Sequence, residues 1–412
     1  MSFDIALSGI QSINEQLGSI SNNIANAGTF GFKSSRANFA AMYAGDRPTG
    51  AHIGSTSQSI TQNGGVLTTN RGLDALINGR GFFVAKDLTG QMNYTRVGIF
   101  TKAADNYLVD ASGRRVQGYA MAPPSTVRGA MADVLVPTGT LPAKPSTKID
   151  FQANMSADWK TPTAPFAALT PGVPADPASY NMSQTSTVYD SLGKQHTITQ
   201  YFRKVAPAGG PPPVPNNLVD VFIAVDGTAS ATATTQLDFD ATGKLTLPAT
   251  GAITVGVLPG SATVAKLDIN LSYLGTTFQA GNASASINAA DGYAPGNYVG
   301  VELNDDGGVI AKYSNGQKQQ IGVLAIATFP NDEGLTPTDN TSWSESGASG
   351  TANYSEPGQG VAGKLTTGSL EQSNVDVTTE LVSLMTSQRN YQANSKVIST
   401  ENAMMQSLMQ AL

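Results

Sequence analysis

Side chains that perform acid–base, nucleophilic or metal chemistry are scarce in this sequence. It contains two histidines, His52 and His196, and no cysteine. A transition-metal site usually needs several histidine or cysteine ligands at short spacing, and a disulfide framework needs cysteine pairs. We therefore predict no metal site, no disulfide and no histidine-based catalytic centre. Both histidines are expected to be packed or surface residues.

The glycine-rich segments offer equally little chemistry. Gly79-Arg80-Gly81 begins like a dinucleotide-binding loop, but Phe82 and Phe83 follow where a third glycine and a helix are needed. Asp305-Asp306-Gly307-Gly308 lacks the alternating oxygen ligands of a calcium loop. We interpret both segments as turns beside strands. With no nucleophile elbow or phosphate-binding loop, the sequence predicts neither an enzyme nor a cofactor site.

The charge composition excludes further classes of partner. Only 13% of the 412 residues are charged, the net charge is −6, and lysine and arginine form no cluster. Clustered cations are needed to neutralise phosphates, so nucleic-acid binding is not expected. No apolar run approaches about 18 residues, which argues against membrane insertion. The first basic residue is Lys33, so we also expect no cleaved secretory signal with a positively charged start.

What the sequence offers instead is a helical pattern at each end. Apolar residues alternate at spacings of three and four over residues 3–27, and they recur every seven residues over 377–412. Such spacing puts one narrow apolar stripe on an α-helix, as in coiled coils. The predicted N-terminal assembly seam consists of Phe3, Ile10, Ile13, Leu17, Ile20 and Ile24. The predicted C-terminal assembly seam consists of Val377, Leu381, Leu384, Tyr391, Ile398, Met405 and Met409.

A single helix cannot bury its own apolar stripe, so the two ends must find each other or other copies of the chain. We predict helices over about residues 2–26 and from 377 nearly to 412, the second capped by the carboxylate of Asp376. Beside the C-terminal seam runs a stripe that is polar but carries no charge, unlike most solvated helix faces. We hypothesise that this stripe lines a channel; it consists of Gln388, Gln392, Ser395, Ser399, Asn402, Gln406 and Gln410.

Strand patterns and glycine turns fill much of the remaining sequence, mainly over residues 71–122 and 296–329. Prolines between 162 and 177 and between 207 and 215 predict irregular loops, because proline removes a ladder hydrogen bond. If the end helices pair, everything between them must loop out and return. We predict an α+β multidomain fold in which coiled-coil-like terminal helices form an axial core and two mainly-β domains are nested. The expected divisions are 1–29 plus 371–412 as the helical axial core, 30–70 plus 353–370 as a connector, 71–146 plus 291–352 as an inner β-domain, and 147–290 as an outer β-domain.

Motifs at both ends resemble one protein family, the bacterial flagellar rod and hook axial proteins. The N-terminal motifs are Leu7-Ser-Gly-Ile10, Ile20–Asn26, Thr29-Phe-Gly-Phe-Lys33 and Arg36–Phe39. The C-terminal motifs are Ser373-Asn-Val-Asp376, Gln388–Asn394 and Lys396–Ser399. Segments that look like the family's β-domain are Gly79–Val84, Tyr94–Arg96, Phe100 and Val116–Tyr119. Segments that look like the outer domain of its hook-type members are Thr187–Gly193, followed by Tyr201 and Phe202.

The resemblance implies a structural subunit, many copies of which assemble into a hollow helical tube outside the cell. It implies a flexible joint that transmits torque from rod to filament, and export through the flagellar type III apparatus. The implied partners are the distal rod protein, the hook cap protein and the hook–filament junction proteins. Rod members are shorter, so the long insert between the β-segments favours a hook-type member. A distal rod or junction protein of the same family, or a secreted β-rich adhesin, are the alternatives.

Overall fold

The computed structural model describes residues 2–121, 127–205, 217–257 and 267–411. The chain divides into two compact units. The terminal unit holds both ends and comprises residues 1–138, 299–312 and 318–412. The middle unit comprises residues 139–298 and 313–317. Each unit is described by itself below.

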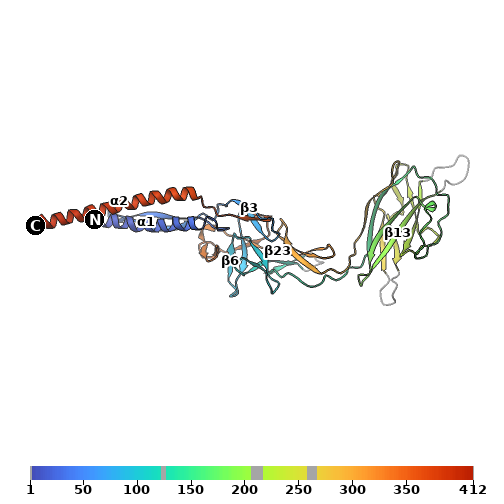
Figure 1. The fold of residues 1–412 in the computed structure, drawn as a ribbon, viewed down its shortest axis with the longest axis horizontal. Helices are drawn as coiled ribbons and strands as arrows, with labels where there is room; N and C mark the ends of the chain where they lie inside the picture. The colour runs from blue at the N-terminus through green and yellow to red at the C-terminus, as the bar shows by residue number, and fades with distance from the viewer. Residues whose placement is uncertain (1, 122–126, 206–216, 258–266, 412) are drawn as a thin grey trace. The chain divides into compact units, whose positions relative to one another are not determined.

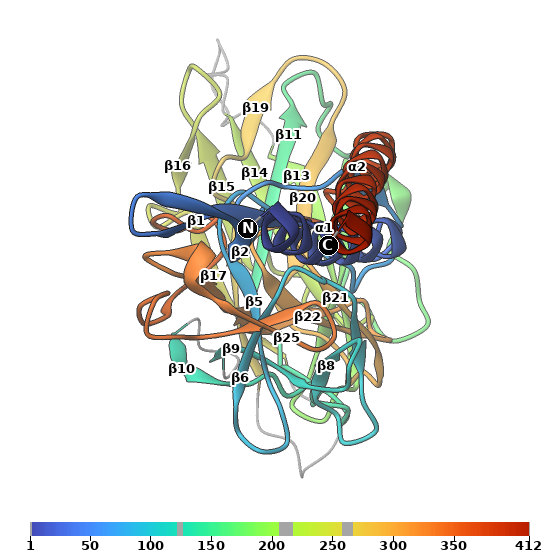
Figure 2. The ribbon, with the colours of Figure 1, turned by 90° about the vertical axis from the view of Figure 1, so that its left-hand side faces the viewer.

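The fold is mostly β with one helix at each end of the chain, as the sequence predicts. Helix α1 spans Ser2–Ala25 and helix α2 spans Val377–Ala411. The two helices lie side by side in the terminal unit (Figures 1 and 2). The carboxylate of Asp376 accepts hydrogen bonds from the backbone N–H groups of Thr378 and Thr379, which satisfies donors that the first turn of α2 leaves free. No described helix is long and apolar enough to cross a membrane.

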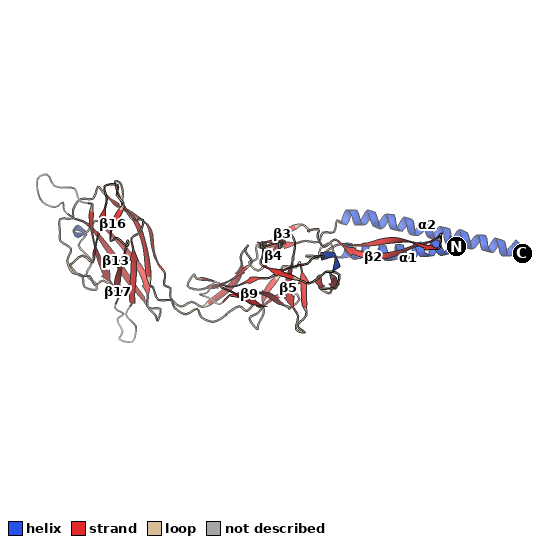
Figure 3. Cartoon of the chain, turned by 180° about the vertical axis from the view of Figure 1, so that it is seen from behind, coloured by secondary structure: helices blue, strands red, loops and turns tan. Residues whose placement is uncertain are grey.

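A long β-hairpin follows α1 within the segment that the sequence analysis assigned only as a connector. Strands β1 (Ser35–Ala44) and β2 (Arg47–Gln58) pair antiparallel. Gly45 forms the turn with a φ of 63°, a left-handed conformation that glycine adopts without steric cost. Figure 3 shows this hairpin running along α1.

The body of the terminal unit is a sheet of 13 strands, whose side chains contribute to an aromatic core. Phe82, Tyr94, Phe329 and Trp343 meet edge-on or tilted in this core, an arrangement that aromatic quadrupoles favour. The strands from the first half of the sequence are β5 (Phe82–Lys86), β6 (Met92–Thr95), β7 (Phe100–Lys102), β8 (Leu108–Asp110), β9 (Arg115–Met121) and β10 (Arg128–Asp133). Those from the second half are β21 (Tyr298–Leu303), β22 (Gly308–Tyr313), β23 (Lys318–Leu324), β24 (Ile326–Thr328), β25 (Thr336–Thr338), β26 (Ser342–Ser344) and β27 (Asn353–Ser355).

Two short ladders close the terminal unit by joining early and late parts of the sequence. Strand β3 (Val66–Thr68) pairs with β29 (Ser369–Glu371), and β4 (Ala75–Asn78) pairs with β28 (Lys364–Thr367). Both pairings are antiparallel. The chain therefore returns to its beginning immediately before α2 starts.

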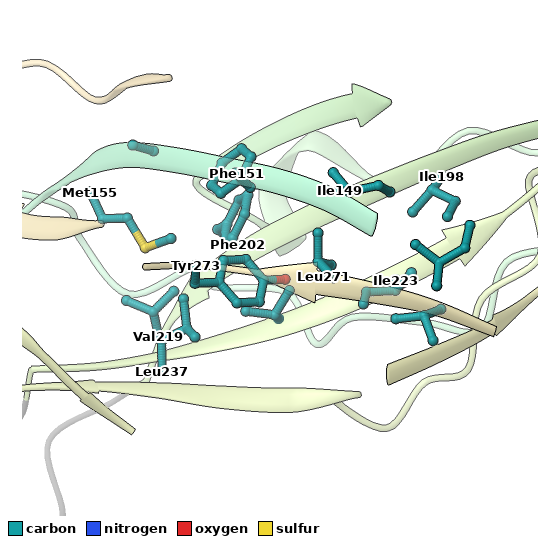
Figure 4. Close-up of a cluster of buried hydrophobic side chains, with 14 of the residues drawn as sticks. Ile149, Phe151, Met155, Ile198, Phe202, Val219, Ile223, Leu237, Leu271 and Tyr273 are labelled. Carbon is teal, nitrogen blue, oxygen red and sulfur yellow. The ribbon is translucent and has the colours of Figure 1, made fainter. Parts of the chain in front are cut away.

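The middle unit consists of two five-stranded sheets that share one hydrophobic core. The first sheet contains β11 (Lys148–Ser156), β17 (Ala252–Val257), β18 (Leu267–Ser272), β19 (Thr277–Gln279) and β20 (Ser284–Ala290). The second contains β12 (Met182–Tyr189), β13 (Gln195–Lys204), β14 (Leu218–Val225), β15 (Thr235–Phe239) and β16 (Leu245–Leu247). Figure 4 shows side chains of both sheets meeting, with Phe151 stacked on Phe202 and Tyr273 beside them.

The proline-rich segment before β12 is largely irregular, as predicted, but it packs on the sheet. Phe166 stacks on Phe222 with ring centroids 4.1 Å apart, and Leu169 joins the same buried cluster. Strand β14 is consequently covered on both faces, which explains its nearly continuous apolar sequence. The second predicted proline loop, at 207–215, lies outside the described residues.

Candidate assembly site

Helices α1 and α2 pack antiparallel and in step, which means that a single register relates the residues of the two helices. The side-chain amide of Asn23 donates to Oε1 of Glu380 at 2.8 Å, and Gly9 faces Asn394, whose Nδ2 would lie 2.9 Å from a Cβ at Gly9. These two contacts are fourteen residues apart along each helix. Glycine at this contact leaves room for the side chain of Asn394, which would have to move if position 9 carried a larger residue.

The N-terminal seam is covered by the rest of the chain along most of its length. Ile13 and Ile20 are buried together with Ala6, which shares the stripe, and Ile10, Leu17 and Ile24 are half-buried. Phe3, at the start of the stripe, is 40% exposed. Packing within one chain therefore covers the centre of this stripe and leaves its N-terminal end open.

The C-terminal seam is covered only in part. Leu384 and Ile398 are half-buried, while Tyr391, Val377 and Leu381 are exposed. Met405 and Met409 are also exposed. Five more large apolar residues of α2 are exposed, although the heptad spacing did not include them: Val382, Met385, Val397, Met404 and Leu408. In a single chain, α2 thus leaves most of its large apolar side chains in water.

Small polar residues complete the face of α2 that α1 covers. Ser387 is only 2% exposed, and Asn394 lies in the contact with Gly9. Sequence reasoning missed these residues because it scored only large apolar side chains. Serine and glycine at helical spacing were the available signal for a close helix contact.

All seven residues of the hypothetical channel stripe are exposed. Gln388, Gln392, Ser395, Ser399, Asn402, Gln406 and Gln410 make no contact that buries them within the chain. The structure thus brings them together on one solvent-facing side of α2. Their exposure is compatible with any neutral solvated surface, including a channel wall.

A polar ladder fixes the β1–β2 hairpin to α1. The hydroxyls of Ser12 and Ser19 donate to the carbonyl oxygens of Ala51 and Ser35, at 3.0 and 3.1 Å. Asn23 is 1% exposed; its amide nitrogen donates to the Ser35 carbonyl at 2.8 Å and its oxygen accepts from the Ser35 N–H at 2.9 Å. These residues recur on the side of α1 next to its apolar stripe. The helix is therefore covered on two sides by its own chain.

A buried cluster of charges joins the two ends of the chain to the sheet. Nζ of Lys33 lies 2.6 Å from Oε1 of Glu371, and both side chains are essentially fully buried. Arg96 approaches Oε2 of the same carboxylate at 3.5 Å and donates to the carbonyl oxygens of Ile77 and Gly79. Burial lowers the pKa of the Lys33 amino group, and the Glu371 carboxylate opposes that shift. Burial likewise lowers the pKa of Arg96. We call Lys33, Arg96 and Glu371 the terminal lock.

Backbone and amide contacts reinforce the terminal lock. Glu371 also accepts from the N–H of Gly64 at 3.1 Å, and its carbonyl accepts from the N–H of Gly31 at 2.8 Å. Asn374 accepts from the N–H of Ser34 at 2.7 Å and donates to the carbonyl of Ser59 at 2.9 Å. Motifs from the two ends that resembled one family therefore meet in space. Sequence reasoning found the motifs but not their contact.

The two histidines behave as structural residues. His52 is exposed on β2. His196 is buried on β13; its Nδ1 lies 2.7 Å from Oδ2 of Asp226 and its Nε2 lies 3.5 Å from Oδ2 of Asp190. The described residues contain no group of three or more His, Cys, Asp or Glu side chains that could hold a metal ion. Gly79 and Gly81 have φ values of 113° and 118° and lead directly into β5, so this segment is a turn.

Comparisons with known proteins place the fold and its terminal helices in one class. Residues 76–152 match the family described as "Flagellar hook protein FlgE/F/G D1 domain". Residues 154–293 match "Flagellar basal body protein FlaE D2 domain", and residues 366–411 match "Flagellar basal body rod FlgEFG protein C-terminal". The three matches together define an axial protein of the bacterial flagellum.

Full-length relatives specify the member of that class. The chain is 37% identical to the flagellar hook protein FlgE of Salmonella typhimurium, with 99% of each chain covered. It is 34% identical to the flagellar hook protein FlgE of Escherichia coli K12, again over 99% of each chain. The chain therefore belongs to the flagellar hook protein family, which is structural rather than enzymatic. It is a hook subunit, part of the flagellum outside the cell.

The crystal structure of the flagellar hook protein FlgE2 of Helicobacter pylori aligns with 73% of this chain and 98% of its own, at a TM-score of 0.49 and 14% sequence identity.

Proposed function

We propose that the chain polymerises into a hollow helical tube whose core is built from α1 and α2 of many copies. The observation that carries this proposal is the exposure of large apolar side chains along α2, including Leu381, Met385, Met405 and Met409. Apolar surface of this extent costs free energy in water, at roughly 25 cal/mol per Å². Neighbouring copies supply the partner that the single chain lacks.

In this proposal the two assembly seams have different tasks. The N-terminal seam holds α1 against α2 of its own chain, because Ile13 and Ile20 are already buried there. The exposed part of the C-terminal seam, Val377, Leu381, Met405 and Met409, packs against other copies. The result is a coiled-coil-like axial core. The predicted divisions into axial core, connector, inner and outer β-domains describe how the remaining chain is arranged around it.

The uncharged stripe of α2 lines the channel of this tube. A conduit for unfolded chains needs a wall that water wets but that does not trap substrates. Fixed charge would retain segments of opposite sign, and apolar surface would adsorb hydrophobic ones. Glutamine, serine and asparagine avoid both problems, and all seven stripe residues are free to face solvent.

The tube acts as the flexible joint that transmits torque from rod to filament. The apolar core resists relative sliding of subunits, while surfaces with only 13% charged residues over the whole chain favour small, wet and easily remade contacts. Export through the flagellar type III apparatus, without a cleaved secretory signal, delivers the subunit. The distal rod protein, the cap protein and the junction proteins are its neighbours.

A density map of the polymerised protein tests the proposal. We expect α2 innermost, with Gln388, Ser395 and Asn402 facing the channel and α1 outside it. A map with α1 innermost, or with these side chains directed into the wall, would contradict the channel assignment. Hydrogen exchange adds a second measurement, because helices that gain their burial from neighbours exchange faster in dilute monomer than in polymer. Equal protection of α2 in both states would contradict the assembly role.

A further inference from the structure

The last turns of α2 extend past the described part of α1. Because the contacts of Asn23 with Glu380 and of Gly9 with Asn394 keep the helices in step, Ser2 lies beside residue 401. Helix α2 nevertheless continues to Ala411. Figures 1 and 3 show its C-terminal end reaching beyond the start of α1. We call residues 402–411 the overhang.

The overhang carries an apolar face and no charged residue. Met404, Met405, Leu408 and Met409 are 59%, 58%, 60% and 73% exposed. Positions 398, 401, 405 and 408 continue at spacings of three and four, so this face prolongs the side of α2 that packs on α1. Methionine side chains are flexible and adapt to irregular partners. The overhang is therefore suited to a surface that is not present beside it in its own chain.

A groove of suitable character lies nearer the sheet, between α1, α2 and the β1–β2 hairpin. It has a volume of about 400 Å³, and its walls include Gly9, Ile13, Gln16, Phe39 and Ala393. All of its lining residues are uncharged. Phe39 lies in this lining and is 48% exposed, so it is an apolar side chain that its own chain leaves partly in water. Small residues at the floor allow a helix to approach closely.

The overhang cannot reach the groove of its own chain. Gln16 lies beside position 387 when the helices are in step, and residue 408 is 21 positions further along the same helix. At about 1.5 Å per residue the separation is about 30 Å. The only complementary occupant that the structure offers is a second copy of the chain.

We propose that the overhang of one subunit docks, through Met404, Met405, Leu408 and Met409, in the groove between α1, α2 and the hairpin of another subunit. The proposal rests on the polymerisation proposed above and identifies the two surfaces that it joins. Because these surfaces differ, the contact is heterologous, and repeating it generates an open helical assembly rather than a closed pair. Each subunit then offers one overhang and one groove.

Disulfide trapping tests the contact directly, because the chain contains no cysteine of its own. In the double variant Gln16→Cys with Leu408→Cys, the two thiols of one chain are too far apart to bond, since a disulfide needs Cα atoms within about 7 Å. We expect oxidation of the polymer to give a ladder of covalent oligomers, and oxidation of dilute monomer to give none. The matched control replaces Ser407, which lies outside the apolar face of the overhang, in place of Leu408; we expect no ladder from Gln16→Cys with Ser407→Cys.

Charge substitution gives an independent measurement. We expect Met405→Asp with Leu408→Asp to raise the concentration needed for polymerisation at least about tenfold, because the contact must then bury two carboxylates. Ser407→Asp should change it less than about twofold. Normal polymerisation of the double aspartate variant, or equal cross-linking from position 407, would contradict this contact alone. Failure of the parent chain to polymerise under any condition would contradict the proposed function and the contact with it.

Discussion

The middle unit and the helical end of the terminal unit differ in how far they bury their apolar side chains. The two sheets of the middle unit bury Phe151, Phe202 and Tyr273 against each other and need nothing from outside (Figure 4). Helix α2 leaves Leu381, Met385 and Met409 exposed. Complete burial makes a unit that is stable by itself, whereas incomplete burial makes one that gains stability from neighbours. One chain therefore combines a domain that buries its own core with a helical surface whose apolar side chains remain exposed.

The largest expected effect comes from placing a charge in a seam. Leu17→Asp or Ile398→Asp should abolish assembly, because both side chains are half-buried and an unpaired carboxylate there costs several kcal/mol in every subunit. Electron microscopy of concentrated protein checks for tubes, and circular dichroism checks that the sheets remain folded. Thr400→Asp, an exposed position on α2 outside both seams, is the control and should still assemble. Tubes from either seam variant would contradict the seam assignment.

The next largest effect concerns the stability of the terminal unit and should leave the middle unit unchanged. Lys33→Met leaves the carboxylate of Glu371 buried without its closest cation, so the terminal unit should lose about 3–5 kcal/mol of stability while the middle unit keeps its own. Each unit contains one tryptophan, Trp343 in the terminal unit and Trp159 in the middle unit. Urea unfolding of single-tryptophan chains, made with Trp159→Phe or Trp343→Phe, therefore reads each unit separately.

A compensating variant distinguishes loss of a charge pair from loss of packing. Adding Glu371→Gln and Arg96→Gln to Lys33→Met removes all three buried charges of the terminal lock and should recover part of the lost stability. Glu302, a half-buried acid that pairs with Lys312 and Lys318, supplies the matched substitution Glu302→Gln, with an expected change below about 1 kcal/mol. Equal destabilisation by Glu302→Gln and Lys33→Met would show that the terminal lock has no special role.

A smaller, pH-dependent effect belongs to the middle unit. Burial by itself raises the pKa of Asp291, but hydrogen bonds from Lys148, Thr147 and Lys144 outweigh it and hold the pKa at about 2. Because the folded pKa is depressed, the stabilisation is present above the unfolded pKa of about 3.9 and is lost as pH falls towards 2. Asp291→Asn should destabilise the middle unit by on the order of 1 kcal/mol at pH 7, a figure discounted for partial exposure, and by almost nothing at pH 2.

Trp159 fluorescence measures this difference during urea unfolding at each pH. The control is Asp150→Asn, because Asp150 pairs with Lys148 at a half-exposed site on the same unit. It should show little effect at either pH. A cost of Asp291→Asn that persists unchanged at pH 2 would rule out the ionised carboxylate as its cause.

The smallest expected effect comes from the connection between β13 and β14. These strands are antiparallel neighbours, and the N–H of Val205 donates to the carbonyl of Leu218 at 3.0 Å, so their ends are already close. Removing most of residues 206–217 should change the stability of the middle unit by about 0.6 kcal/mol or less, because loop-closure entropy varies slowly with length. Tubes should still form, with altered shape as the one expected difference. Loss of polymerisation, seen by microscopy, would assign this segment to the assembly contact.

The parts of the fold that sequence alone could predict are those set by local pattern. The apolar spacing predicted helices at both ends, and Asp376 marked the start of α2. The sequence did not predict the β1–β2 hairpin, because its contact with α1 is made partly by hydrogen bonds instead of apolar packing. The hydroxyls of Ser12 and Ser19 on α1 donate to backbone carbonyls of the hairpin. A turn at Gly45 was its main local signal.

The contacts that sequence could not predict are those between distant segments. Lys33, Arg96 and Glu371 show no mutual spacing, and each alone resembles an ordinary surface charge. The heptad spacing also predicted more buried apolar side chains on α2 than one chain has. Ser387 and Asn394 instead provide much of the face towards α1. Pattern identified which residues prefer burial, but three-dimensional packing decides which of them obtain it within one chain.

The terminal lock also affects the order in which parts of the chain can fold. Lys33 and Glu371 are 338 residues apart in the sequence. If the chain is threaded through a narrow passage from either end, this contact cannot close until the whole intervening segment has emerged. The middle unit draws nearly all of its strands from one continuous stretch, 139–298, and can close earlier. Under that condition a subunit interrupted on its way out keeps its two ends apart and presents no paired helices.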